Sequence, residues 1–197
     1  MEKENIQGAS AQKAPRREKS QLMSASEIDR TLVRLAHEIV ERHNGVEGLV
    51  LVGIRRRGAP LASRLAHKFA DIEKKATPVG ILDITFHRDD LPAAKQKPVV
   101  QDCKLPFSVE GKDVILVDDV LYTGRTTRAA LDALLSSGRP RRVELCVLID
   151  RGHRELPIQA NFVGRVVQTS AVESIQVRLN EVDGEERVVM CESDPKT

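Results

Sequence analysis

The sequence predicts an α/β fold in which helices flank an open, mostly parallel sheet. Between about residues 25 and 150, short apolar runs of the kind found in strands buried on both faces alternate with helical segments. A length of 197 residues is enough for one domain with a sizeable core. Ligands of such sheets bind at the carboxyl ends of the strands, so polar residues that follow the apolar runs are the first candidates for a site.

The N-terminal region divides at about residue 24. Residues 1–24 contain few large apolar side chains and no periodicity, which predicts a disordered tail. The remaining residues, 25–197, are expected to form a single domain. Its first helix begins at Ser24 or Ser26, has apolar residues at helical spacing, and ends at Asn44-Gly45.

Strands and helices are then expected to alternate. Pro60 suits the first turn of the second helix, and Gly138 ends the third. Asp183-Gly184 separates "SIQVRLN" from "ERVVMC", which predicts a hairpin on a two-residue turn and hence a small β-rich hood at the C-terminus. The strands expected in the parallel sheet are 48–54, 78–84, 113–117 and 142–150.

The composition excludes several classes of protein. Lys and Arg number 31 and Asp and Glu 29, so no whole-protein charge attracts nucleic acid. No apolar run approaches the ~20 residues that span a bilayer, and the polar N-terminus lacks a signal-like segment. Three widely spaced cysteines without metal-ligand spacing favour a reducing, cytoplasmic compartment and no membrane association.

Two adjacent carboxylates, Asp118 and Asp119, follow the third apolar run and are expected in the binding crevice. The turn after them, Tyr122 to Thr126, offers unpaired backbone N–H groups, hydroxyls, a glycine and the positive end of a helix dipole, the components of a phosphate cradle. The carboxylates can hold sugar hydroxyls or a Mg²⁺ ion that binds phosphate oxygens. By itself, an Asp-Asp pair is more often a solvated turn.

Two other classes of nucleotide-binding protein lack their motifs in this chain. A P-loop nucleotidase requires Gly-x-x-x-x-Gly-Lys-Ser/Thr, and a dinucleotide-binding fold requires Gly-x-Gly-x-x-Gly after a strand; the sequence contains neither. A phosphate-and-ribose site in one continuous motif therefore remains as the interpretation.

The segment "VILVDDVLYTGRT" (114–126) resembles the phosphoribosyl pyrophosphate (PRPP) motif of type I phosphoribosyltransferases. More narrowly, the chain resembles the PyrR family of bifunctional pyrimidine operon attenuation proteins and uracil phosphoribosyltransferases, from about Ser26 to the C-terminus. The supporting segments are "LVGIRRRGAPLASRLA" (51–66), "LDITFHRDDL" (82–91), "LIDRGHRELPI" (148–158) and "NFVGRVVQTS" (161–170).

The resemblance implies that uracil and PRPP are converted to UMP and pyrophosphate, with Mg²⁺ as cofactor. Loss of pyrophosphate leaves positive charge on the sugar, so catalysis requires positioning and electrostatic stabilisation and no protein nucleophile. Asp118 and Asp119 would then hold the ribose hydroxyls, directly or through the metal, and Thr123 to Thr126 would cradle the 5-phosphate. The substrate contacts expected in the motif are Val120, Leu121, Tyr122, Thr123, Gly124, Arg125 and Thr126.

Other crevice residues come from separate segments. Three arginines in a turn are by composition more often a solvated patch, but their place at a strand's carboxyl end makes "RRR" at 55–57 a candidate for pyrophosphate binding. The family usually has Thr where Arg56 stands. Residues 85–111 form a long irregular connection, expected to be a flexible active-site loop that closes over PRPP with Arg88 as its catalytic contact. The remaining expected substrate contacts are Arg55, Arg56, Arg57, Arg151 and Val167.

The resemblance also implies binding to the leader mRNA of the pyrimidine operon, strengthened by UMP or UTP. Basic residues of the first helix lie opposite its apolar stripe and face solvent, although such a face alone is usually just solvated. The family commonly has Arg where Gln159 stands and Thr where Val33 stands, and each change removes a contact. The residues expected to contact RNA are Arg30, Arg34, His37, Arg42, His153, Arg154 and Arg165.

Three functions are therefore compatible with the sequence. The chain is a bifunctional enzyme and regulator, an attenuation regulator with little catalytic activity, or a phosphoribosyltransferase for another base without RNA binding. A homodimer or higher homo-oligomer is expected in each case.

Overall fold

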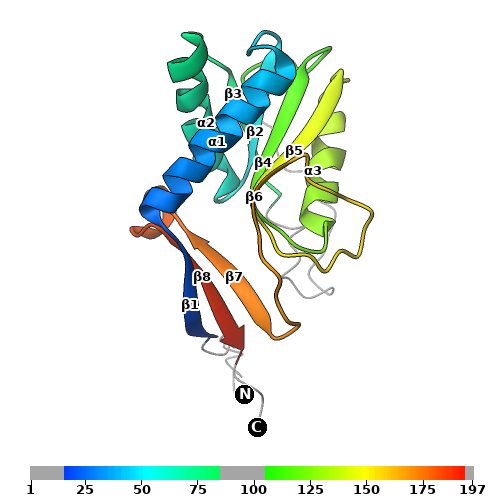
Figure 1. Cartoon of the computed structure of the whole chain (residues 1–197). Coiled ribbons are helices and arrows are strands. Elements are labelled where there is room, and N and C mark those ends of the chain that lie inside the picture. Colours follow the sequence, from blue (N-terminus) through cyan, green and yellow to red (C-terminus); the bar gives the residue numbers. More distant parts are fainter. Residues whose placement is uncertain (1–15, 85–104, 194–197) are drawn as a thin grey trace, which may run out of the picture.

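The structure, a computed structural model, describes residues 16–84 and 105–193 and contains two sheets (Figure 1). The larger sheet has five parallel strands in the order β3-β2-β4-β5-β6, and the smaller has three antiparallel strands in the order β1-β8-β7. This arrangement confirms the predicted α/β class with a small C-terminal β-rich unit. The parallel strands are β2 (Leu49–Ile54), β3 (Val79–Leu82), β4 (Asp113–Leu121), β5 (Arg142–Asp150) and β6 (Phe162–Val166).

Helices cover both faces of the parallel sheet (Figure 1). α1 (Ala25–His43) and α2 (Gly58–Glu73) pack on one face, and α3 (Arg125–Leu135) packs on the other. Successive strand residues alternate between the two cores: Ile115 packs in the α1 and α2 core, whereas Leu116 packs in the α3 core. The near-continuous apolar runs are therefore explained by burial on both faces.

The predicted ends of the first helix are confirmed. The Glu27 carboxylate accepts hydrogen bonds from the backbone N–H of Ser24 at 2.8 Å and from its hydroxyl at 2.7 Å. At the other end Asn44 has φ 54°, and the N–H of Gly45 donates to the carbonyl of Val40. Both termini thus satisfy backbone groups that the helix itself cannot pair.

The expectation of a disordered tail up to residue 24 is wrong for residues 16–24. They form β1 (Arg16–Ser24), which pairs antiparallel with β8 (Arg187–Ser193). Met23 is buried at 2% exposure, and Glu18 accepts two hydrogen bonds from Arg187. Because the partner strand is so distant in the sequence, no local pattern indicates this strand. Residues 1–15 lie outside the described part of the chain.

Three other differences concern strand lengths and connections. β7 (Glu173–Arg178) and β8 are antiparallel as expected, but Arg178 pairs with Arg187, so the connection comprises residues 179–186 and includes the single turn α4 (Asn180–Asp183). β4 extends past the predicted end at residue 117 because it keeps pairing with β5. β6 was not expected.

None of the helices in the described residues is long and apolar enough to cross a membrane.

Candidate active site at the carboxyl ends of the parallel strands

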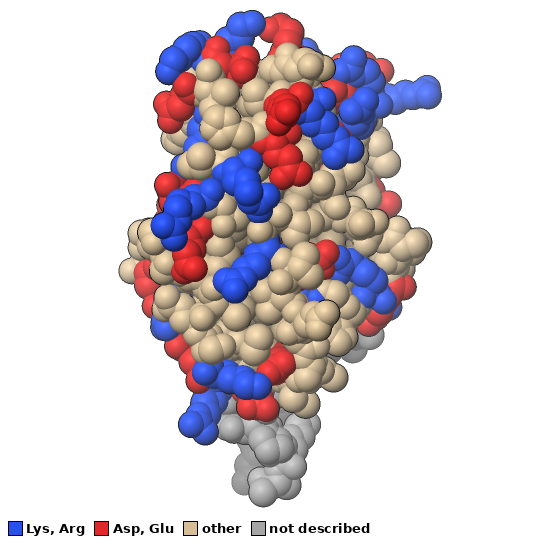
Figure 2. Space-filling view, in the orientation of Figure 1, with Lys and Arg blue, Asp and Glu red and all other residues tan. Residues whose placement is uncertain are grey.

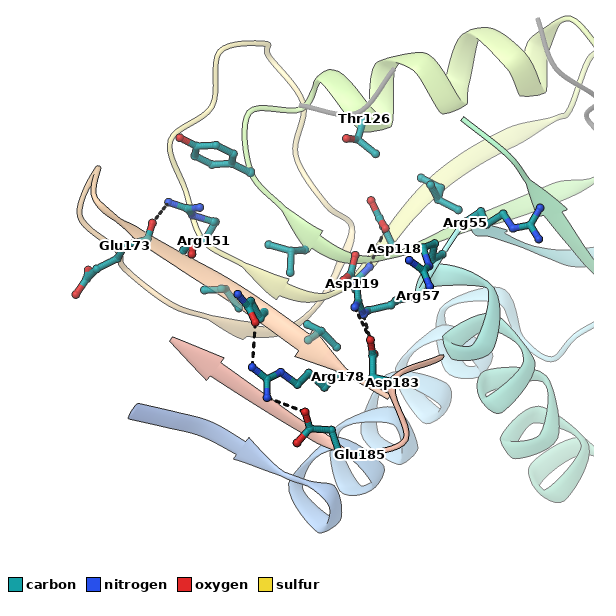
Figure 3. Close-up of a pocket in the computed structure, with 18 of the residues that line it drawn as sticks. Arg55, Arg57, Asp118, Asp119, Thr126, Arg151, Glu173, Arg178, Asp183 and Glu185 are labelled. Carbon is teal, nitrogen blue, oxygen red and sulfur yellow. Dashed lines mark hydrogen bonds and ion pairs between the residues drawn. The ribbon is translucent and has the colours of Figure 1, made fainter. Parts of the chain in front are cut away.

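A cavity of about 690 Å³ lies between the carboxyl ends of β2 and β4 and the face of β7 (Figure 3). It gathers segments that are far apart in the sequence: the acidic pair Asp118 and Asp119, the arginine turn at residues 55–57, the start of α3, and the small sheet β1-β8-β7, which we call the hood. The sequence-predicted residues that line it are Arg55, Arg56, Arg57, Asp118, Asp119, Val120, Tyr122, Thr126 and Arg151.

The acidic pair lies in the last part of β4. Asp118 is only 6% exposed, and its Oδ1 accepts a hydrogen bond from the backbone N–H of Asp119 at 2.9 Å. The arginine turn approaches closely because Gly58, at the start of α2, has no Cβ; one built there would lie 2.3 Å from the carbonyl oxygen of Val117. A glycine is therefore required for the turn to lie beside the aspartates.

The start of α3 forms the third side of the cavity. Gly124 is the N-cap residue with φ 92°, in the left-handed region that favours glycine, and the hydroxyl of Thr123 accepts a hydrogen bond from the backbone N–H of Arg125 at 3.3 Å. Thr126, in the first turn, lines the cavity near the positive end of the helix dipole. Four other predicted contacts in this motif do not line it, namely Leu121, Thr123, Gly124 and Arg125.

The arginine turn is held by carboxylates on both sides. Arg57 donates two hydrogen bonds to Asp183, at 3.0 and 2.7 Å, and Arg55 donates one to Asp83 at 2.8 Å. The peptide bond between Arg55 and Arg56 is cis. Hydrogen bonding to Asp183, together with the nearby charge of Asp119, raises the pKa of Arg57 despite its partial burial. The Arg57 guanidinium is thus a permanent cation at the cavity wall.

Asp183 shows the opposing effects of burial and pairing. Burial alone would raise the pKa of Asp183, but the hydrogen bonds from Arg57 and from the N–H of Leu179, with the charge of Arg56, leave it below its ordinary value. Figure 3 shows Asp183 reaching toward Arg57 from the hood. The hood is therefore connected to the arginine turn by an ion pair.

Arg151 closes the opposite end of the cavity. It is only 7% exposed, and its guanidinium lies 4.0 Å from the ring centroid of Tyr122. Its Nη2 donates to the carbonyl of Glu173 at 2.8 Å (Figure 3).

Val167 packs in the core and does not line the cavity, so its expected contact with the base stays a prediction. Arg88 lies outside the described residues.

The hood side of the cavity was not predicted from the sequence motifs. The alternation of polar and apolar residues in "SIQVRLN" predicted a strand, but only the fold shows that this strand faces the aspartates. Arg178, for example, forms ion pairs of 2.6 Å with Glu18 and with Glu185 at the cavity wall. The lining residues that were missed are Ile54, Ala171, Val172, Glu173, Ser174, Ile175, Gln176, Val177, Arg178, Asp183 and Glu185.

Three of the predicted RNA contacts line a separate surface pocket between α1 and β6: Arg30, Arg34 and Arg165. Arg34 donates to the carbonyls of Val163 at 3.0 Å and Gly164 at 2.7 Å, and Arg165 donates to the carbonyl of Leu22. His37 is exposed on the same helix. Figure 2 shows basic and acidic side chains intermingled on this face, with no continuous basic surface.

The other predicted RNA contacts differ in their surroundings. Arg154 donates to the carbonyls of Tyr122, Gly152 and Ile158 at 2.8 to 3.0 Å, and to Asp150 at 2.5 Å, so its guanidinium holds the loop together and does not face outward. Its expected contact with RNA stays a prediction, and only the folded loop brings these carbonyls together. Arg42 lies over the ring of Phe162 and pairs with Glu144 at 3.3 Å.

Comparisons with known proteins agree with this geometry. A family model described as phosphoribosyl transferase domain matches residues 20–181. The bifunctional protein PyrR of Pelotomaculum thermopropionicum is 60% identical over 177 residues, 90% of this chain and 98% of that protein. The bifunctional protein PyrR of a strain of Thermus thermophilus is 58% identical over 174 residues, 88% and 96% of the two chains.

A solved structure shares the fold at much lower identity. The hypoxanthine phosphoribosyltransferase of Staphylococcus aureus superposes with a TM-score of 0.69 at 20% identity, over 89% of this chain and 92% of that one. Similarity at this level describes the architecture alone. The close relatives and the family model together show that the chain belongs to the PyrR family of phosphoribosyltransferases.

Proposed function

We propose that the protein transfers ribose 5-phosphate from PRPP to uracil and forms UMP and pyrophosphate. The observation that supports this most directly is the convergence of the acidic pair, the arginine turn and the start of α3 on one cavity. PRPP presents three matching parts: ribose hydroxyls, a pyrophosphate and a 5-phosphate. Membership of the PyrR family adds uracil as the acceptor.

Each group has a distinct task in this reaction. Thr126 and the backbone N–H groups at the start of α3 bind the 5-phosphate, with help from the helix dipole. The arginine turn binds the pyrophosphate, where the fixed charge of Arg57 favours the leaving group. Asp118 and Asp119 bind the ribose hydroxyls and stabilise positive charge as it develops on the sugar. The rate enhancement then comes from positioning and preorganised charge.

The acidic pair also fits a Mg²⁺ ion. Mg²⁺ is usually held by one or two protein carboxylates together with waters and substrate phosphates. In the residues that the structure describes, no group of three or more His, Cys, Asp or Glu side chains could hold a metal. We therefore expect Asp118 and Asp119 to hold the ion jointly with the substrate. When bound, Mg²⁺ would neutralise part of the pyrophosphate charge.

A steady-state assay tests the activity. Purified protein is mixed with PRPP and Mg²⁺ and with uracil, hypoxanthine or guanine, and the nucleotide formed is quantified. We expect UMP formation with uracil and at least about a hundredfold lower rates with the purines, since a site that pairs with one base rejects another when its polar groups are left unpaired. Turnover with a purine alone would contradict the assignment of uracil.

We further propose that the protein binds pyrimidine-operon leader RNA, more tightly with UMP or UTP. The pocket lined by Arg30, Arg34 and Arg165 beside Glu27 supports this, because guanidinium groups bind phosphates well and those of Arg34 and Arg165 are exposed while they donate to backbone carbonyls. Fluorescence anisotropy with a leader hairpin at two salt concentrations, with and without UMP, tests it. Affinity no higher than for an unrelated hairpin would leave a uracil phosphoribosyltransferase without a regulatory role.

A cytoplasmic location accompanies this proposal, because the transcript and PRPP are cytoplasmic. We also expect the protein to self-associate into a dimer or larger homo-oligomer. Sedimentation equilibrium across a range of protein concentrations measures the oligomeric state. A monomer at every concentration would contradict the expectation of self-association.

A further inference from the structure

Thr169, which follows β6 in the sequence, is held from two sides. The Nε of Arg151 donates to its Oγ1 at 3.2 Å, and the Nε2 of His153 lies 2.6 Å from its backbone carbonyl oxygen. Arg151 lines the cavity, whereas His153 is exposed. Thr169 itself does not line the cavity. One residue therefore joins a cavity side chain to a surface side chain.

The Arg151 end of this connection is firmly held. Arg151 is nearly buried, lies over the ring of Tyr122 and donates to the carbonyl of Glu173. Tyr122 and Glu173 both line the cavity. A nucleotide that contacts any of these three groups fixes the guanidinium that donates to Thr169. Because an unpaired buried guanidinium is costly, a ligand that displaces one of these contacts acts on the others.

The His153 end is held less firmly. His153 has a φ of 57°, in the left-handed region that L side chains rarely adopt. It follows Gly152, whose φ is 74°, and precedes Arg154, whose guanidinium holds the loop. The imidazole meets the edge of the Tyr122 ring, with centroids 6.1 Å apart and planes at 68°. The carbonyl of Thr169 is thus the hydrogen-bonding group that orients the His153 ring.

We propose that Thr169 is a positioning residue that couples nucleotide in the cavity to the orientation of His153 on the RNA-binding surface. This inference rests on the proposed function, in which a uridine nucleotide binds in the cavity and His153 contacts RNA. With nucleotide bound, Arg151 is restrained further and its hydrogen bond restrains Thr169, so the carbonyl presents His153 in one orientation. Without nucleotide, the loop and the imidazole occupy several orientations. Nucleotide then strengthens RNA binding by selecting one of them.

A mutant series separates this coupling from binding itself. RNA dissociation constants are measured with and without UMP for the wild type, Thr169→Val, Thr169→Ala and Thr169→Ser. Val and Ala remove the acceptor for Arg151 and keep the backbone carbonyl, so we expect the ratio of the two dissociation constants to fall to about one. Ser keeps the hydroxyl and should restore the wild-type ratio. RNA affinity without UMP and uracil turnover should stay near wild type in all of them.

A second readout uses reciprocity between the two ligands. If UMP strengthens RNA binding by some factor, RNA must strengthen UMP binding by the same factor, and calorimetric titration of UMP measures this. We expect Thr169→Val to lose both effects together. A purely structural role for the hydroxyl would lower the melting temperature and leave both ratios unchanged.

The outcomes distinguish this inference from the proposed function. Wild-type coupling in folded Thr169→Val and Thr169→Ala overturns the role of Thr169 and leaves RNA regulation intact. A wild type that binds leader RNA equally well with and without UMP overturns the coupling and leaves RNA binding intact. A wild type that does not bind leader RNA overturns both.

Discussion

The two ends of β4 both present carboxylates, but they surround them differently. At the amino end, Asp113 accepts hydrogen bonds from Arg141 at 2.8 and 2.6 Å and lies 3.3 Å from Nδ1 of His43. The other ring nitrogen of His43 lies 2.7 Å from Glu144, at the start of β5. At the carboxyl end, Asp118 and Asp119 line a cavity.

Burial alone does not distinguish the two ends. Asp113 and Glu144 are each 4% exposed and Asp118 is 6% exposed. At the amino end the surrounding cations, Arg42 and Arg141, belong to the chain and compensate the buried charge, and the His43 ring lies against both carboxylates. At the carboxyl end the space beside the carboxylates is large enough for a ligand. The difference between the two ends is therefore the cavity beside Asp118 and Asp119, which allows these carboxylates to meet a ligand.

The largest effect on activity is expected at the carboxyl end. Asp118→Asn combined with Asp119→Asn should lower kcat/KM for PRPP and uracil by about 10³-fold or more, because preorganised charge at a reacting centre is usually the largest contribution to catalysis. The melting temperature should change by no more than about 2 °C, measured by circular dichroism. Near-normal turnover would remove the distinction between the two ends.

The reverse pattern is expected at the amino end. Glu144→Ala should lower the free energy of unfolding by about 1–3 kcal/mol, because it removes a buried carboxylate that pairs with Arg42 at 3.3 Å and lies 2.7 Å from Nε2 of His43. Turnover by the folded protein should be unchanged. Asp132→Ala is the matched control, since Asp132 pairs with Arg128 on an exposed face, with 65% of its own side chain accessible. This control should cost about 0.5 kcal/mol or less.

The pH dependence of stability tests the same end. The hydrogen bonds from Arg141 lower the pKa of Asp113 below its ordinary value of 3.8, although burial opposes the shift. A carboxyl whose pKa is lower in the folded state contributes stability that is fully present above the unfolded value and is lost as the pH falls through the folded value. The difference in unfolding free energy between wild type and Asp113→Asn should therefore be constant above about pH 5 and decrease below about pH 4. A difference that grows on acidification would contradict this assignment.

A smaller effect is expected at the start of α3. Thr126→Ala should raise the KM for PRPP about tenfold, the loss expected for one hydrogen bond to a charged group. Because Gly124 is the N-cap residue and the hydroxyl that accepts from the first N–H of α3 belongs to Thr123, the melting temperature should hardly change. Ser137→Ala, beyond the far end of the helix, serves as the control. Loss of stability with unchanged KM would indicate that Thr126 only supports the helix.

The smallest effect concerns the loop after β5. Gln159 is exposed there, at the position where the resemblance implies an Arg. Gln159→Arg should raise affinity for leader RNA about threefold to tenfold. The slope of the logarithm of affinity against the logarithm of salt concentration should steepen by about one, as expected for one added phosphate contact. Uracil turnover should stay the same. An unchanged salt slope would show that this loop does not reach the RNA.

Much of the architecture follows from local sequence. The apolar runs, the capping pair Ser24 and Glu27, and the Asn44-Gly45 stop all correspond to observed elements. The motif from 114 to 126 was sufficient to identify the candidate site, because its carboxylates and its helix start are continuous in the chain. Periodicity and capping depend on residues a few positions apart, so local sequence specifies them.

Other features depended on contacts between distant residues. β1 forms only because β8 offers an edge, and β7 faces the aspartates only because the small sheet packs beside the large one. Arg154 looked like a surface cation, yet its guanidinium is bound by carbonyls that the folded loop brings together. No spacing rule indicates such contacts.

The sequence by itself thus determined the fold class, the family and the acidic motif, because each depends on order and spacing along the chain. The tertiary structure decided which carboxylates lie among cations at one end of β4 and which line a cavity at the other, and it placed Thr169 between Arg151 and His153. The physical reason is that the energy of a charge or a polar group depends on its partners in space. Only the folded chain brings those partners together.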